Sequence, residues 1–132
     1  MKLLIAALLA AFSTSAMAEW TWVGSPTDNT FDIYIDQTTI RKQGNVAKMW
    51  GMRDYKSLQK SAGGESYLSR KVFYEYDCVE IRDRSLATTY FSRNIGKGEA
   101  VLSYQYDNDN SKWQDVEPDS VGMISWKAAC KK

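Results

Sequence analysis

The sequence predicts an α+β fold, an antiparallel β-sheet meander of five to six strands followed by a C-terminal α-helix that a disulfide tethers to the sheet. Three observations predict this fold. Much of the chain consists of short runs in which apolar and polar residues alternate, and turn residues separate these runs. One segment near the C-terminus shows helical spacing instead. The two cysteines of the chain, Cys78 and Cys130, stand at the end of a strand-like run and at the end of the helical segment.

The first strands are predicted as a hairpin. In the run FDIYIDQTTI, residues 31–40, Phe31, Ile33 and Ile35 face one side and the residues between them face the other. Gly44-Asn45 then predicts a turn, and residues 46–52 form a second alternating run. From Lys56 to Ser66 the chain is polar and contains a glycine pair, which predicts a flexible loop.

The third strand is SRKVFYEYDC, residues 69–78, and its alternation separates two faces. One face carries Val72, Tyr74, Tyr76 and Cys78, and the other carries Phe73, Glu75 and Asp77. Because Cys78 shares its face with large apolar and aromatic side chains, we expect this cysteine to point toward the core.

The rest of the chain completes the sheet and adds the helix. A fourth strand lies within residues 80–92, with a bulge where the alternation slips near Arg84-Ser85, and a glycine turn at 94–99 leads to a strand at 100–106. These two strands are predicted to be adjacent and antiparallel, because consecutive strands joined by short connections usually pair. A polar loop and the short segment WQDV follow them. The helix is expected to start at Pro118 and to end near Cys130. Its apolar spacing comes from Val121, Ile124 and Ala128.

The N-terminal segment has the layout of a secretory signal peptide. Residues 1–18 contain one positive charge, an apolar run and a small-residue ending, which predicts cleavage between Ala18 and Glu19. The apolar run is too short to span a bilayer, and no cysteine follows the cleavage site to accept a lipid. We therefore expect one domain, residues 19–132, that is exported and periplasmic or secreted, without a membrane span or lipid anchor.

Export determines how the cysteines are interpreted. Disulfides form and persist outside the cytoplasm, and two cysteines allow one intramolecular pair, Cys78–Cys130. A free or intermolecular thiol is the alternative, whereas a zinc site is disfavoured because the chain has no histidine. The predicted bond closes a loop of about 50 residues, for which chain entropy gives a stabilisation of about 4 kcal/mol.

Composition also limits the chemistry. With 17 basic and 16 acidic residues, the net charge gives no reason to expect a nucleic-acid partner. The absence of histidine excludes Ser-His-Asp and Cys-His catalysis. A glycosidase-type carboxylate pair would have to come from Glu75, Asp77, Glu80 and Asp83, which we expect to be solvated. The loop DNDNS at 107–111 starts like a calcium loop, but Lys112 stands where that motif needs glycine. We expect no enzyme, no catalytic or metal-binding residues and no cofactor.

Aromatic residues are abundant, with 5 tryptophans and 8 tyrosines. We expect most of them to fill the small core. Those on the outer face of the third strand are the candidates for contact with a protein partner, so Phe73, Glu75 and Asp77 form the predicted partner-binding site. The sequence does not indicate an oligomeric state.

Several segments resemble the surface-adhesin protein E family of small exported bacterial proteins. They are WTWVG, YIDQTTI, GNVAKMW, YLSRKVFYEYDC, SLATTYFSRNIGKGEAV, WQDVEPDSV and the final AAC. The resemblance extends from Trp20 to Cys130. It implies an antiparallel sheet with a disulfide-held helix and a non-enzymatic protein that binds host matrix or serum proteins such as vitronectin, laminin and plasminogen.

The chain departs from that family in one respect, because Glu19 stands where a lipid-accepting cysteine would follow the signal. The alternative hypothesis is therefore a soluble periplasmic domain, structural or stress-related, that acts on a partner in the same cell.

Overall fold

The computed structural model describes residues 18–131. The predicted signal peptide lies outside these residues except for Ala18, and its cleavage and the domain bounds stay predictions. The described part contains one α-helix and an antiparallel sheet in which six strands follow the order β1-β2-β3-β4-β5-β6 and a short seventh strand lies off this path. Their bounds are β1 Thr21–Gly24, β2 Phe31–Gln43, β3 Val46–Lys60, β4 Ser66–Asp77, β5 Arg82–Phe91, β6 Ala100–Gln105 and α1 Val121–Cys130. The predicted fold class is confirmed.

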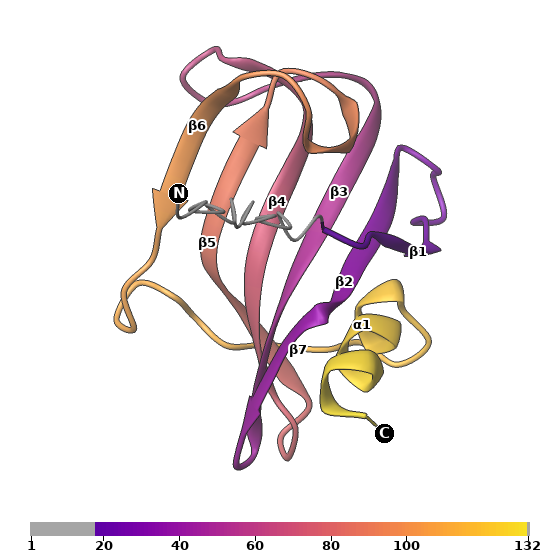
Figure 1. The fold of residues 1–132 in the computed structure, drawn as a ribbon, viewed down its shortest axis with the longest axis vertical. Helices are drawn as coiled ribbons and strands as arrows, with labels where there is room; N and C mark the ends of the chain where they lie inside the picture. The colour runs from indigo at the N-terminus through magenta and orange to yellow at the C-terminus, as the bar shows by residue number, and fades with distance from the viewer. Residues whose placement is uncertain (1–17, 132) are drawn as a thin grey trace, which may run out of the picture.

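The strands lie side by side with β1 and β6 at opposite edges, and α1 lies beside β2 and β3 (Figure 1). The two-residue strand β7, Gln114–Asp115, pairs with the start of β5 on the way to the helix. A short 3-10 turn, η1 Asn94–Gly96, connects β5 to β6. Consecutive strands pair throughout, as expected for a meander with short connections.

Two strands differ from the sequence-based expectation. β1 was not expected, and β3 continues to Lys60, into the stretch predicted to be a loop. The loop proper is shorter and is closed by hydrogen bonds between Ser61 and Glu65. The strand continues through these polar residues because β3 pairs there with β4. Gln59 lies opposite Tyr67 and Lys60 lies opposite Ser66. This pairing satisfies the backbone N–H and C=O groups whatever the side chains are.

The sheet has two faces, which we name by their relation to the helix. The inner face, marked by Ala47, Met49 and Tyr76, packs against α1, and the outer face is its opposite, marked by Trp50 and Phe73. The core cluster lies between the inner face and the helix and consists of Ile35, Ala47, Met49, Tyr76, Cys78, Trp126, Ala129 and Cys130.

The disulfide is present as predicted. Cys78 and Cys130 are bonded, with their Cα atoms 5.6 Å apart, and both residues are buried. The bond joins the residue after β4 to the last residue of α1. The indole N–H of Trp126 donates to the backbone oxygen of Asp77 at 2.8 Å, so a hydrogen bond and a covalent bond hold the helix at the same place.

The helix differs from its prediction at its start and on its buried face. It begins at Val121 and not at Pro118, because Asp119 has a left-handed conformation, φ 58°, that a helix cannot include. The buried side chains are those of Ser125, Trp126, Ala129 and Cys130, whereas Ile124 is 48% exposed. The apolar spacing of Val121, Ile124 and Ala128 therefore does not mark the buried face, since the position of the disulfide sets the rotation of the helix.

Ser120 caps this helix, and its removal gives a first prediction. The side-chain oxygen of Ser120 accepts a hydrogen bond from the backbone N–H of Met123 at 3.1 Å. Ser120→Ala should lower the free energy of unfolding by about 1 kcal/mol, because that N–H loses its side-chain acceptor and keeps only the backbone oxygen of Ser120 at 3.2 Å. Urea unfolding measures the change. Ser120→Asp keeps an acceptor and should unfold close to the wild type, and equal losses in both variants would contradict the capping role.

Candidate binding site

The three residues predicted to contact a partner do share the outer face, but their surroundings differ. Phe73 is half-buried and stacks on Trp50, with ring centroids 5.0 Å apart and planes 25° apart. The expectation of a solvated carboxylate is wrong for Glu75, which is only 8% exposed. The guanidinium of Arg84 lies directly opposite on β5 and pairs with Glu75 at 2.6 Å, which makes this burial tolerable.

Asp77 has a structural role at the end of β4. It pairs with Arg82 at 2.7 Å and accepts hydrogen bonds from the backbone N–H groups of Val79 and Glu80. The hydrogen bond from Arg82, together with those from the backbone, holds the pKa of Asp77 below its ordinary value. Asp77 therefore shapes the turn that leads to Cys78. Its part in partner binding stays a prediction.

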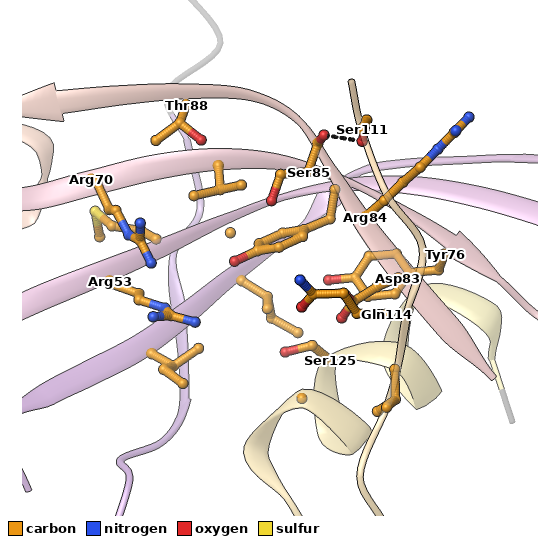
Figure 2. A pocket seen from close by; sticks show the side chains of 18 of the residues that line it. Arg53, Arg70, Tyr76, Asp83, Arg84, Ser85, Thr88, Ser111, Gln114 and Ser125 are labelled. Carbon is orange, nitrogen blue, oxygen red and sulfur yellow. Dashed lines mark hydrogen bonds between the residues drawn. The ribbon is translucent and has the colours of Figure 1, made fainter. Parts of the chain in front are cut away.

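A pocket on the inner face was not predicted. The helix covers only part of that face, and a cavity of about 630 Å³ remains between the sheet, α1 and the chain around β7. Figure 2 shows Arg53 and Arg70 at one end of this pocket and Asp83, Gln114 and Ser125 toward the other. Of the four acids considered for a carboxylate pair, only Asp83 lines the pocket. The pocket therefore does not bring two of these four acids together.

A bulge in β5 aims three side chains into the pocket. The register shifts between Phe73 and Tyr74, so that Phe73 pairs with Ala87 and Tyr74 pairs with Ser85. One extra residue on β5 lets Ser85 and Thr88, three positions apart, both line the same pocket as Asp83. The predicted bulge near Arg84-Ser85 is therefore present and shapes this site.

The pocket contains groups in unusual electrostatic surroundings. Burial raises the pKa of Asp83 to about 6, although nearby Arg53 acts to lower it. Burial also raises the pKa of Tyr74 and raises that of Tyr76 well above its ordinary value, so both hydroxyls are neutral donors at pH 7. Burial opposes the charge of Arg70, but the neighbouring tyrosines raise its pKa above the ordinary value. The interior of the lining thus offers cations, hydroxyls and the partly buried carboxyl group of Asp83.

The aromatic residues fill less of the core than expected. Of the 5 tryptophans, only Trp126 belongs to the core cluster, and Trp22 is 58% exposed. Rings instead form a chain across the strands, with centroid distances of 5.4 Å for Phe31–Tyr55, 5.6 Å for Tyr55–Tyr67, 4.7 Å for Tyr67–Tyr90 and 6.3 Å for Tyr90–Tyr104. One helix of 10 residues is too short to cover a sheet of this width, so rings cover the remainder.

Other possible sites are limited. Within residues 18–131, no group of three or more His, Cys, Asp or Glu side chains is placed to hold a metal ion. In the same part of the chain, no helix has the length and apolar character needed to cross a membrane. The loop at 107–111 is closed by its own hydrogen bonds, because Asp107 accepts from the backbone and side chain of Asn110.

An antiparallel sheet with a disulfide-held helix and a polar pocket on one face defines a small α+β domain. The family model of surface-adhesin protein E matches residues 20–131 of the chain. The chain therefore belongs to the surface-adhesin protein E family, as its sequence segments suggested. No curated protein matches the chain in sequence.

Solved structures of this family have the same fold. Crystal form II of Haemophilus influenzae protein E is 11% identical, with a TM-score of 0.60, and the match covers 83% of this chain and 87% of that one. Protein E from non-typeable Haemophilus influenzae is 12% identical, with a TM-score of 0.55 and coverage of 87% and 86%. At this identity the likeness supports the architecture and does not carry over individual residues.

Proposed function

We propose that this domain is a non-catalytic adhesin that works outside the cytoplasm and binds a host matrix or serum protein through the outer face of β3, β4 and β5. Membership of the surface-adhesin family supports the class of function. The observation that supports the location is the stacked pair of Trp50 and Phe73, on the face opposite to the helix.

The surroundings of this pair suit protein recognition. Ion pairs of Glu75 with Arg84 and of Asp77 with Arg82 lie along the same strands. The ring of Trp113 packs against both arginines, 4.4 Å from the guanidinium carbon of Arg84 and 5.2 Å from that of Arg82. Tryptophan, tyrosine and arginine are the residue types that most often dominate binding energy at protein interfaces. The outer face thus combines aromatic anchors with arginines already fixed in position.

Binding of the purified protein to immobilised vitronectin, laminin and plasminogen tests the proposal. Phe73→Ala should weaken binding to the recognised protein by about thirtyfold, the effect of losing a typical hot-spot side chain of about 2 kcal/mol. The matched control is Leu58→Ala, which removes a 59% exposed apolar side chain near the end of β3 and should leave binding unchanged. Absence of binding to all three proteins, or equal binding by Phe73→Ala and the wild type, would count against the proposal.

The second candidate is a periplasmic domain that acts on a partner in the same cell. The observation that favours it is Glu19, since a lipid-accepting cysteine is absent at the position after the predicted cleavage. Cell fractionation separates the two candidates. Mature protein confined to the periplasm would remove the adhesin proposal, and protein at the cell surface or in the medium would remove the periplasmic one.

A further inference from the structure

Arg53 and Arg70 lie in an arrangement that costs stability. They are directly opposite each other on β3 and β4, and both line the pocket on the inner face. Like charges at opposing positions of neighbouring strands repel each other. The ion pairs found in the described part of the chain join Lys48 and Arg84 to Glu75 and Arg82 to Asp77. Neither Arg53 nor Arg70 takes part in them, and the opposite charge that acts on Arg53 is that of the partly buried Asp83.

Aromatic rings hold both guanidinium groups in place. The guanidinium carbon of Arg53 lies 4.9 Å from the centroid of Phe31, and that of Arg70 lies 5.9 Å from the centroid of Tyr90. Arg70 also donates to the hydroxyl of Tyr90 at 3.4 Å. A guanidinium that packs against a ring keeps most of its in-plane N–H donors available. The buried Nε of Arg70 indeed has no hydrogen-bond partner, and a buried donor in that state costs free energy.

The remainder of the pocket indicates the kind of molecule that fits. Its volume of about 630 Å³ is within the usual range of about 300–1,000 Å³ for small-molecule sites. Beyond the arginines the pocket offers the hydroxyls of Ser85 and Ser125 and the carboxyl group of Asp83. The exposed charges at the rim, Lys112, Asp115 and Glu117, are screened by water.

We propose that this pocket binds a small organic acid whose single carboxylate lies between Arg53 and Arg70 and whose other end donates hydrogen bonds to Asp83. A carboxylate matches the fork of N–H donors of two guanidinium groups. The two arginines and Asp83 leave one net positive charge in the interior, which a single carboxylate neutralises and a doubly charged phosphate would exceed. A hydroxylated or amino-substituted acid supplies the donor for Asp83. This site lies on the face opposite to the proposed adhesive surface and does not depend on it.

Calorimetric titration and thermal unfolding with matched probes test the proposal. Glucuronate, gluconate and serine are the carboxylate probes, glucose is the uncharged counterpart of glucuronate, and glucose 6-phosphate tests the phosphate alternative. At least one carboxylate probe should bind saturably at millimolar concentration and raise the melting temperature, whereas glucose should not. Binding of none of the three acids, equal binding of glucose and glucuronate, or binding of glucose 6-phosphate alone would overturn the proposal.

Variants then locate the site. Arg53→Gln and Arg70→Gln should each weaken binding of the active probe about ten- to hundredfold, the value of one or two charge-assisted hydrogen bonds. Arg41→Gln removes an exposed arginine on β2 and is the matched control, with unchanged binding expected. Without ligand, Arg70→Gln should melt at or above the wild-type temperature, because the repulsion between the arginines is gone. Wild-type affinity in either pocket variant would overturn the assignment of the carboxylate site to Arg53 and Arg70. The comparison of glucuronate with glucose tests the need for a carboxylate without any variant.

Discussion

Replacing Cys130 by serine should lower the free energy of unfolding by about 4 kcal/mol under oxidising conditions. Cys78 and Cys130 are 52 residues apart in sequence, so the bond removes much of the freedom of the unfolded chain. The native state also depends on it, because α1 has 10 residues, fewer than an isolated helix needs in water. For a domain of this size the loss corresponds to a fall in melting temperature of about 15 °C or more.

Thermal unfolding with and without a thiol reductant measures this effect. Reductant should bring the wild type down to the stability of Cys130→Ser and should change the variant little. The variant Cys78→Ser, which removes the other half of the same bond, is the matched control and should behave like Cys130→Ser. A further fall of Cys130→Ser in reductant, or a wild type that reductant does not affect, would contradict the stabilising role of the bond.

The elements that the sequence predicts well are those determined by local pattern. The period-two runs at 31–40, 46–52 and 69–78 are strands, and Gly44-Asn45 is the turn between the first two. Alternation also places Cys78 on the core side, and the bond to Cys130 confirms it. These features depend on residues a few positions apart, so the sequence alone contains the information they need.

The pocket depends on long-range register, which local pattern does not determine. Arg53 and Arg70 are 17 positions apart and become neighbours only because Val46 pairs with Asp77 and each following pair keeps that register. The sequence nevertheless contains one indication of this site. Arg70 stands at alternate positions with Val72 and Tyr74, so it lies on the strand face that is predicted to point toward the core. A charged residue in such a position has few explanations other than a ligand or a paired network.

The helix shows a related limit. Val121, Ile124 and Ala128 have helical spacing, but the structure turns Trp126 and Ala129 toward the sheet and leaves Ile124 exposed. A disulfide at Cys130 and a hydrogen bond from Trp126 to the backbone of Asp77 determine the rotation. Periodicity gives the existence of a helix, whereas its orientation comes from contacts with distant parts of the chain.

Asp83→Asn should make the protein more stable at pH 7.5, by up to about 3 kcal/mol. The pKa of Asp83 in the folded state is raised to about 6, because burial opposes its charge. A raised folded-state pKa means that the folded protein binds this proton more tightly than the unfolded chain does. The stabilisation from Asp83 is therefore complete below its ordinary pKa of 3.8 and is lost as the pH rises through about 6. Asparagine imitates the protonated form and avoids that loss.

Urea unfolding between pH 4 and pH 7.5 measures the difference between Asp83→Asn and the wild type. The advantage of the variant should be largest at pH 7.5 and should vanish toward pH 4, where the wild-type carboxyl is protonated when folded. Asp109→Asn, a matched change in an exposed loop, should give no such trend. A difference that does not vary with pH would mean that the gain comes from packing and not from the charge of Asp83.

Arg53 extends the same argument to the pocket. Arg53 acts to lower the pKa of Asp83, so in Arg53→Gln the loss of stability should continue to a higher pH and become larger. Two arginines that repel each other and a carboxyl group that burial makes costly to ionise lie in one cavity. Residues that lower stability persist where function requires them. A bound organic acid would recover part of the stability lost at Asp83 and at the arginine pair, because its carboxylate would neutralise the two guanidinium groups and its other end would donate to Asp83.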